Sequence, residues 1–247
     1  IEKTRQNMNL QEIKDTLCHD YKYKIELDAH TSPASRCSEI SPREIVKTYK
    51  RLGFHAVAVT NHFSHNHSKL TKEEYIDFFL KDFEETEKFG KAIGVKVYLG
   101  AEICFEENRN EYLVFGISRK MLEEIYDFLP FGVENFRNNY SLPHSIFLQA
   151  HPLRDGIEKV DPEILDGVEV FNMHPGHNSR IGQVADWAKQ NNLSIITAGS
   201  DFHHPHKNHE GLAAIRSKYL PSDSFDLAKL LKKGDFLIEI CGNIVLK

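Results

Sequence analysis

The feature that most constrains the fold is an alternation of short apolar runs with amphipathic helical segments along almost the whole chain. Predicted strands cover residues 24–30, 55–62, 95–105, 111–117, 145–151, 167–172 and 193–201. Predicted helices begin after Ser41 and Thr71, each with a glutamate three residues later as in a capping box. Further helices are predicted over 118–129 and 180–189, and the tail predicts a short strand, a helix over 224–233 and a last strand.

This alternation predicts an α/β fold whose apolar strands are covered on both faces. Seven strand–helix units favour a (β/α) barrel one unit short of eight, and an open doubly wound sheet is the alternative. The absence of a glycine-rich dinucleotide loop disfavours the open sheet. A chain of 247 residues suits a single domain. We expect a leading segment over 1–20, a barrel over 24–204 and closing elements over 205–247.

Composition argues against long nucleic acid and membranes as partners and favours a cytoplasmic location. The net charge of −5 gives no general surface for long nucleic acid and no polybasic membrane patch. No apolar run approaches the ~20 residues of a membrane span. The four cysteines include no C-x-x-C pair, which predicts reduced thiols and a cytoplasmic protein. The oligomeric state is left open.

The predicted strands end repeatedly on acidic, amide and imidazole side chains. These residues are Asp28, His30, Asn61, His62, Glu102, His151, Glu169, Asn172, Asp201 and His203. In a parallel α/β barrel such ends converge on one face, where unpaired buried charges would be costly. Metal ions would satisfy them together, and carboxylates with imidazoles suit Zn, Mn or Fe. The pattern therefore predicts a metal centre.

Strand alternation and loop composition give two further expectations. Glu26, Asp28 and His30 should share one face of their strand, opposite Ile25, Leu27 and Ala29. The remaining histidines of the two histidine-rich loops are expected in solvent. They are His65, His67, His206 and His209.

Five short motifs, in order along the chain, resemble those of the polymerase and histidinol phosphatase (PHP) family. They are Glu26-Leu27-Asp28-Ala29-His30-Thr31, Thr60-Asn61-His62, Gly100-Ala101-Glu102, His151 in QAHP, and Asp201-Phe202-His203. The resemblance implies a distorted (β/α)7 TIM-like barrel, two or three divalent ions, and phosphoester hydrolysis. It implies one ion held by Asp28, His30, Glu102 and Asp201. Glu102 would bridge to a second ion shared with His151, and His62 and His203 would hold a third.

The chain departs from the family pattern at several positions. Asp28 stands where the family has histidine, and Asn61 where it has aspartate. A ligand histidine expected on the fourth strand is missing. Nearby Glu111 is either a substitute for that ligand or, as we favour, a solvated residue at a strand start. Near a further family ligand position lies Cys37, either a ligand for a soft metal or an ordinary half-buried thiol. Cys104 is expected in the core.

The resemblance thus implies a metal-dependent phosphoesterase that hydrolyses a small phosphomonoester or nucleotide-type substrate through a metal-bridged hydroxide. Phosphate also needs a cationic partner, for which the candidates are Arg154, Arg180 and, more weakly, Arg36. His203, His204 or His174 would protonate the leaving group. The catalytic set is therefore His203, Asp201, Arg154 and Arg180. The alternatives are a metal-dependent amidohydrolase-type enzyme and a non-catalytic metal-binding PHP module.

Overall fold

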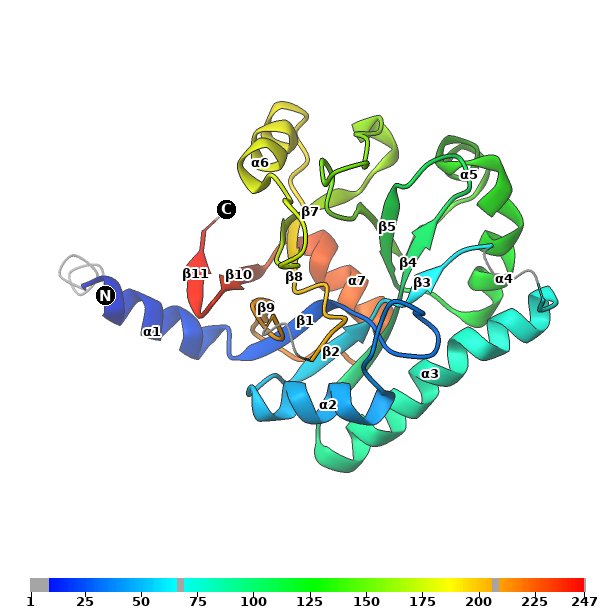
Figure 1. Ribbon diagram of the computed structural model, residues 1–247. Coiled ribbons are helices and arrows are strands. Elements are labelled where there is room, and N and C mark those ends of the chain that lie inside the picture. The colour runs from blue at the N-terminus through cyan, green and yellow to red at the C-terminus, as the bar shows by residue number, and fades with distance from the viewer. Residues whose placement is uncertain (1–8, 66–68, 206–208, 247) are drawn as a thin grey trace.

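A computed structural model describes residues 9–65, 69–205 and 209–246, and shows a curled mixed sheet with helices packed around it (Figure 1). Within this part of the chain, ten strands pair in the order β11-β10-β9-β1-β2-β4-β5-β6-β7-β8, and β3 pairs with β4 beside them. The strands are β1 (Tyr23–Ala29), β2 (Ala56–Val59), β3 (His62–Phe63), β4 (Lys96–Cys104), β5 (Glu111–Phe115), β6 (Ile146–Gln149), β7 (Gly167–Asn172), β8 (Ile196–Gly199), β9 (Ala213–Ser217), β10 (Phe236–Ile240) and β11 (Asn243–Val245).

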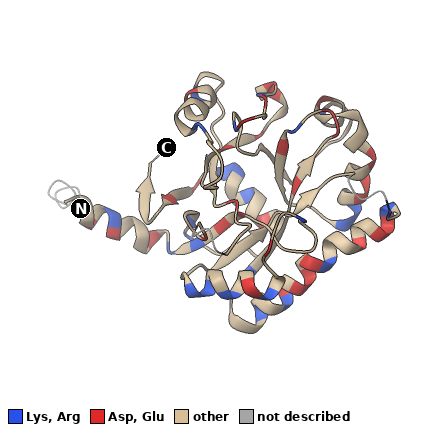
Figure 2. Cartoon of the chain, viewed as in Figure 1, with Lys and Arg blue, Asp and Glu red and all other residues tan. Residues whose placement is uncertain are grey.

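The described residues form seven α-helices, two of which start at the caps that the sequence predicts. They are α1 (Leu10–Asp20), α2 (Pro42–Arg51), α3 (Lys72–Ile93), α4 (Arg119–Phe128), α5 (Val133–Asn139), α6 (Ile181–Gln190) and α7 (Ser224–Lys233), with short 3₁₀ turns η2 (Leu129–Phe131) and η3 (Pro162–Ile164). Ser41 and Thr71 both form the expected capping boxes, with Glu44 and Glu74. Lys is interspersed with Asp and Glu along α3, whereas α2 carries mainly Lys and Arg (Figure 2). Among the described residues, no helix combines the length and apolar content needed to cross a bilayer.

The sheet differs from the expected (β/α)7 barrel, although it is a curled α/β sheet. β4 pairs antiparallel with β5, and β5 antiparallel with β6. Only six residues separate β4 from β5, too few for the crossover that a parallel pair requires. The ladder also does not continue from β8 to β1, where a single bridge joins Ala29 to Phe202. The result is an open half-barrel, not a closed ring of parallel strands.

The core forms on both sides of the sheet. One apolar cluster fills the space between the curled sheet and α7, and includes Ile25 and Leu27 of β1. A second cluster joins the outer side of β1 and β2 to α2, and contains Ala29 and Tyr49. Ala29 was expected on the same face of β1 as Ile25 and Leu27, but it lies on the opposite side of the sheet. The reason is that the pairing of β1 with β2 is irregular between Glu26 and Ala29.

This irregularity separates the side chain of Glu26 from those of Asp28 and His30, with which it was expected to share a face of β1. The Glu26 carboxylate accepts hydrogen bonds from Tyr49 Oη (2.9 Å) and Ser200 Oγ (2.6 Å). It also accepts bonds from the backbone N–H groups of Ser200, Leu27 and Asp28. Burial raises the pKa of Glu26 to about 7 despite these donors. The hydrogen bonds of Glu26 therefore connect β1 to α2 through Tyr49 and to the end of β8 through Ser200.

Replacing Glu26 with alanine is expected to destabilise the protein by about 3 kcal/mol, because several buried donors lose their acceptor. Urea unfolding followed by circular dichroism measures the change. Glu84→Ala, at an exposed position of α3, is the control and should change stability by less than ~0.5 kcal/mol. Equal effects of the two substitutions would show that the Glu26 network does not stabilise this edge of the sheet.

Candidate metal centre

The seven predicted metal-ligating residues meet at one edge of the curled sheet. Asp28 and His30 lie at the end of β1, His62 on β3, Glu102 on β4, His151 just beyond β6, and Asp201 and His203 just beyond β8. All are buried except His62, whose side chain is 25% exposed. Gly199 permits this convergence, since a Cβ there would collide with Asp28 Cβ and Glu169 Oε1.

Glu102 lies at the middle of the cluster. Its Oε1 is 3.1 Å from His151 Nε2, and its Oε2 is 2.8 Å from His62 Nδ1 and 3.5 Å from His30 Nε2. Burial disfavours the carboxylate, but His62 and His151 outweigh it and hold the pKa of Glu102 at about 2. One carboxylate therefore contacts imidazoles from three separate segments of the chain.

The loop after β1 determines which nitrogen of His30 carries its proton. Ser35 Oγ donates to Asn61 Oδ1 (2.9 Å), so it can only accept from His30 Nδ1 at 3.2 Å. His30 is therefore protonated at Nδ1, and burial holds its pKa well below the usual value, so the ring is neutral. The lone pair of Nε2 then faces Asp28 Oδ1 (3.2 Å), Glu102 Oε2 (3.5 Å) and Asp201 Oδ1 (3.5 Å).

Three carboxylates crowd the side of the cluster nearest β7 and β8. Burial and the neighbouring Asp201 raise the pKa of Asp28 to about 6, and burial and Asp28 raise the pKa of Glu169 well above its usual value. Asn172 Nδ2 donates to Glu169 Oε2 (2.9 Å) and to Asp201 Oδ2 (3.3 Å). Arg154 donates to Asn172 Oδ1 (2.8 Å) and pairs with Asp201. The neighbouring positive charges therefore do not offset the effects of burial and of carboxylate repulsion on the pKa values of Asp28 and Glu169.

Glu111 lies within the cluster and not in a solvated position at a strand start. Its Oε2 is 3.1 Å from His151 Nε2, and its Oε1 is 3.3 Å from His62 Nδ1. The side chain is 20% exposed. Because β5 runs antiparallel to β4, its first residue pairs with Cys104 at the edge where β4 ends. Cys104 is half-buried beside the centre, and its Sγ donates to Glu111 Oε1 (3.4 Å).

Replacing Glu111 with alanine is expected to lower metal affinity at this side of the centre by at least about 10- to 100-fold. A loss of this size is typical even for residues that do not bind the metal but hydrogen-bond to its ligands. Isothermal titration with Mn²⁺ measures it. Glu106→Ala, at a side chain 51% exposed and paired with His65, should bind as the parent does. Unchanged Mn²⁺ affinity in Glu111→Ala would remove Glu111 from the set of ligands.

A cavity of about 290 Å³ opens over the cluster. Its walls include Cys37, His174, His204 and Arg154, together with the cluster residues His62, Glu102, Glu111, Asp201 and His203. Cys37 is exposed at the surface of the cavity, next to His62 and His203. Partial desolvation of the thiol raises its pKa, but the interactions with the two histidines outweigh this effect and lower the pKa to about 6. Asp201 and Cys37 likewise outweigh burial and raise the pKa of His203 to about 10.

The arginines predicted for phosphate binding lie in different surroundings. Arg154 lines the cavity, and its Nε has no partner among the described residues. Arg180 contacts Asp155 and the carbonyl of Leu153, outside the cavity wall. Arg36 is exposed and is not part of that wall.

One histidine expected in solvent supports the centre instead. His209 is fully buried, and its Nε2 lies 3.3 Å from the carbonyl oxygen of Asp201. Its ring packs edge-on against Phe202. His65 is half-buried and paired with Glu106, while His67 and His206 lie outside the described residues.

The donor set suits divalent cations. Four overlapping groups have ligand atoms within 4.8 Å of one another: Asp28, His30 and Glu102; Glu102, Glu111 and His151; His30, His62 and His203; and His62, Cys104 and Glu111. Asp28 Oδ2, His30 Nε2, His62 Nδ1 and Glu102 Oε2 are buried without a well-formed hydrogen bond. Unsatisfied buried polar atoms are costly, and a shared cation would satisfy them.

Comparison with solved structures gives one match that supports the fold and two further matches with lower TM-scores. Over 91% of this chain and 66% of the other, the fold is similar (TM-score 0.64, 14% identity) to a two-domain protein from Bacteroides vulgatus containing a predicted PHP-like metal-dependent phosphoesterase. An inferred metal-dependent phosphoesterase from Bifidobacterium adolescentis matches with a TM-score of 0.45 and 18% identity, over 74% of this chain and 89% of that one. An amidohydrolase from Chromobacterium violaceum, with bound sulfate and no metal, matches with a TM-score of 0.44 and 13% identity, over 74% of this chain and 89% of that one.

Comparison of sequences gives two further results. Among curated proteins, no sequence matches this chain significantly. The sequence profile of the PHP domain matches residues 26–198, about 70% of the chain. The matched segment contains Asp28, His30, His62, Glu102 and His151, and ends shortly before Asp201 and His203.

Proposed function

The chain belongs to the PHP domain family, and from that premise we propose that it is a metal-dependent phosphoesterase acting on a small phosphomonoester or nucleotide-type substrate. The observation that carries the proposal is the lone pair of His30 Nε2, which faces three carboxylate oxygens within 3.5 Å. A single proton on Nε2 or on one of the oxygens would neutralise only part of this cluster of carboxylates. A divalent cation would satisfy all four atoms.

We propose two positions for divalent ions that share Glu102. One is held by Asp28, His30, Glu102 and Asp201, and the other by Glu102, Glu111 and His151. Ions bound there would supply Lewis acidity, which activates water and neutralises charge on a phosphoryl group. The abundance of carboxylates favours Mn²⁺ or Fe²⁺ over a purely thiophilic ion.

The chain's own residues bind and orient the substrate. Arg154 is held by Asn172 and Asp201 and lines the cavity, so its guanidinium is placed to donate to a phosphate oxygen bound there. Arg180, bonded to Asp155 and Leu153, steadies the loop that carries Arg154. Arg154 is therefore the arginine we assign to the phosphate.

The cavity wall also narrows the choice of proton donor. Burial lowers the pKa of His174 to about 4, so at neutral pH this ring is neutral and lacks the acidic proton of an imidazolium. His203, which pairs with Asp201, and His204 then stay as candidates for protonating the leaving group. Two further proposals concern the whole chain. We propose that the chain forms one domain, and we propose that the protein acts in the cytoplasm.

The test is hydrolysis by protein reconstituted with Mn²⁺ or Zn²⁺. The panel contains p-nitrophenyl phosphate, bis(p-nitrophenyl) phosphate, nucleoside monophosphates, sugar phosphates and matched N-acyl amides. We expect turnover of at least one phosphoester and of none of the amides. Fully loaded protein that hydrolyses no member of the panel would instead indicate a non-catalytic metal-binding module. Turnover of amides alone would indicate an amidohydrolase-type enzyme.

A further inference from the structure

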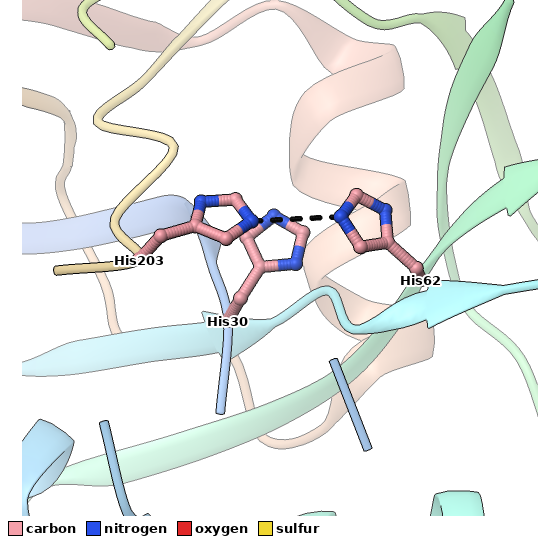
Figure 3. Close-up of side chains that lie close together, drawn as sticks. All are labelled: His30, His62 and His203. Carbon is pink, nitrogen blue, oxygen red and sulfur yellow. Dashed lines mark hydrogen bonds between the residues drawn. The ribbon is translucent and has the colours of Figure 1, made fainter. Parts of the chain in front are cut away.

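The ring of His30 is held in one orientation inside the centre. It is fully buried, and its centroid lies 4.0 Å from that of His203 and 4.6 Å from that of His62 (Figure 3). In this orientation Nδ1 faces Ser35 Oγ, and Nε2 faces the carboxylates, with Asp28 Oδ1 at 3.2 Å. Ring packing does not decide which of the two nitrogens carries the proton, so hydrogen-bond partners must decide it.

The hydroxyl group of Ser35, which faces Nδ1, uses its whole hydrogen-bonding capacity. A hydroxyl has one proton to donate and two lone pairs. Ser35 donates its proton to Asn61 Oδ1 (2.9 Å), and one lone pair accepts the backbone N–H of His62 (3.0 Å). The second lone pair faces His30 Nδ1 at 3.2 Å. Since a backbone N–H cannot accept, Asn61 Oδ1 is the acceptor that keeps the Ser35 proton away from His30.

The side-chain amide of Asn61 is itself fixed in orientation. Its Oδ1 also accepts the backbone N–H of Thr31 at 2.7 Å, and its Nδ2 donates to Thr31 Oγ1 at 2.9 Å. Turning the amide over would place the Nδ2 protons against the Thr31 N–H and the Ser35 hydroxyl proton, so that donors would face donors. Asn61 is buried, so such a mismatch would be costly. A backbone group therefore determines where the acceptor oxygen lies.

A carboxylate on α3 ends this chain of hydrogen bonds. Thr31 Oγ1 donates to Asp82 Oδ2 (3.1 Å), and the backbone N–H of Ala34 donates to the same oxygen (2.9 Å). An ionised carboxylate only accepts, so every proton of the chain points away from His30 and toward Asp82. An amide suits position 61 for the same reason. A carboxylate there would compete with Asp82 for the single hydroxyl proton of Thr31.

We propose that Asn61 is a positioning residue of the centre, which orients the Ser35 hydroxyl so that His30 keeps its proton on Nδ1 and presents the Nε2 lone pair before any ion binds. Without an acceptor at position 61, the Ser35 proton turns toward His30 Nδ1. The ring proton then lies on Nε2, where Asp28 Oδ1 accepts it, and an ion would have to displace it. The inference rests on the proposed metal centre, and it assigns a role to a residue that is not a ligand.

The experiment reads the tautomer of His30 in the metal-free full chain labelled with ¹⁵N-histidine. Long-range ¹H–¹⁵N correlation spectra distinguish a protonated ring nitrogen from one with a lone pair, and the His30 signals are those missing from His30→Gln. The parent protein should show the Nδ1–H tautomer. Asn61→Leu removes the acceptor at nearly constant volume and should show the Nε2–H tautomer. Asn61→Ala removes the same acceptor with a smaller side chain, which keeps the test available if Asn61→Leu does not fold.

Two matched variants separate this role from a merely structural one. Asn61→Asp keeps the acceptor for Ser35 and should keep the Nδ1–H tautomer. Thr31→Val removes a buried hydrogen bond from the same chain but leaves Asn61 Oδ1 in place, and it should also keep the Nδ1–H tautomer. Isothermal titration with Mn²⁺ gives a second readout. Asn61→Leu should bind about 10- to 100-fold more weakly than the parent protein, and Asn61→Asp should bind nearly as the parent does.

The outcomes that overturn the inference differ from those that overturn the proposed function. An Nε2–H tautomer in the parent protein, or an Nδ1–H tautomer in both Asn61→Leu and Asn61→Ala, would remove the positioning role and leave the proposed function intact. A tautomer switch in Thr31→Val equal to that in Asn61→Leu would show that any break in the chain has this effect, and would also remove the role. Failure of the parent protein to bind Mn²⁺ would contradict the metal centre itself, and with it the proposed function.

Discussion

Glu102→Gln is expected to reduce phosphoester turnover by roughly 10³-fold or more and to remove most of the bound metal, while the protein keeps its fold. The reason is geometric, because both oxygens of Glu102 face imidazoles from other segments, His151 on one side and His62 with His30 on the other. A neutral amide keeps the volume but loses the charge that would be shared between two ions. Turnover and metal content are measured on the same reconstituted sample.

The control for this substitution is Glu106→Gln, because the Glu106 side chain is 51% exposed and pairs with His65. It should match the parent protein in both turnover and metal content. Circular dichroism and the melting temperature of Glu102→Gln establish that the fold is retained. A Glu102→Gln variant with full activity and full metal content would mean that Glu102 does not bridge the centre.

Removal of metal is expected to abolish activity and to lower the melting temperature by about 10 °C. Asp28 and Glu169 already have raised pKa values, chiefly from burial, with nearby carboxylates adding to it. An ion at 1,000 times its Kd stabilises the folded state by about 4 kcal/mol, and each kcal/mol is worth about 2–4 °C for a chain of this size. Differential scanning calorimetry before and after dialysis against a chelator measures the shift.

Restoring Mn²⁺ or Zn²⁺ should return both activity and melting temperature, whereas Ca²⁺, which lacks affinity for imidazole nitrogen, should return little. Glu102→Gln should melt at nearly the same temperature with and without chelator. If the parent protein melted at the same temperature in both buffers, the buried carboxylates and imidazoles would be stable without cations.

The elements that the sequence predicts correctly depend on local patterns. The capping boxes at Ser41 and Thr71 begin their helices as expected, because the cap, the glutamate and the apolar stripe all lie within a few residues. The apolar strands were also expected at the observed positions. The convergence of Asp28, Glu102 and His151 follows from their places at the ends of strands that run in the same direction.

The surroundings of Glu111 were predicted incorrectly because strand direction is not a local property. In a parallel barrel, the first residue of a strand lies away from the site, and a glutamate there would be solvated. β5 instead returns antiparallel to β4, which brings Glu111 opposite Cys104 and next to His62. The six-residue connection between the two strands was the available signal, since a parallel crossover needs a dozen residues or more.

Two further differences arise where backbone geometry departs from regular strand. The irregular pairing near Glu26 turns that carboxylate toward Tyr49 and leaves Asp28 with the centre. Asp201 adopts a φ of 49° beyond the end of β8, although the predicted strand extended to this residue, and it meets His203 through a turn. His209 closes over this turn in the core. Neither irregularity has a pattern of residue types that would identify it beforehand.

The central claim, that cations hold these side chains together, is tested most directly by a crystal structure of protein loaded with Mn²⁺ and Zn²⁺. Anomalous difference maps at the absorption edge of each metal locate the ions. We predict peaks at bonding distance from both oxygens of Glu102, roughly 2.0–2.2 Å. Maps without any peak at Glu102, with its oxygens still in direct contact with His62 and His151, would contradict the account.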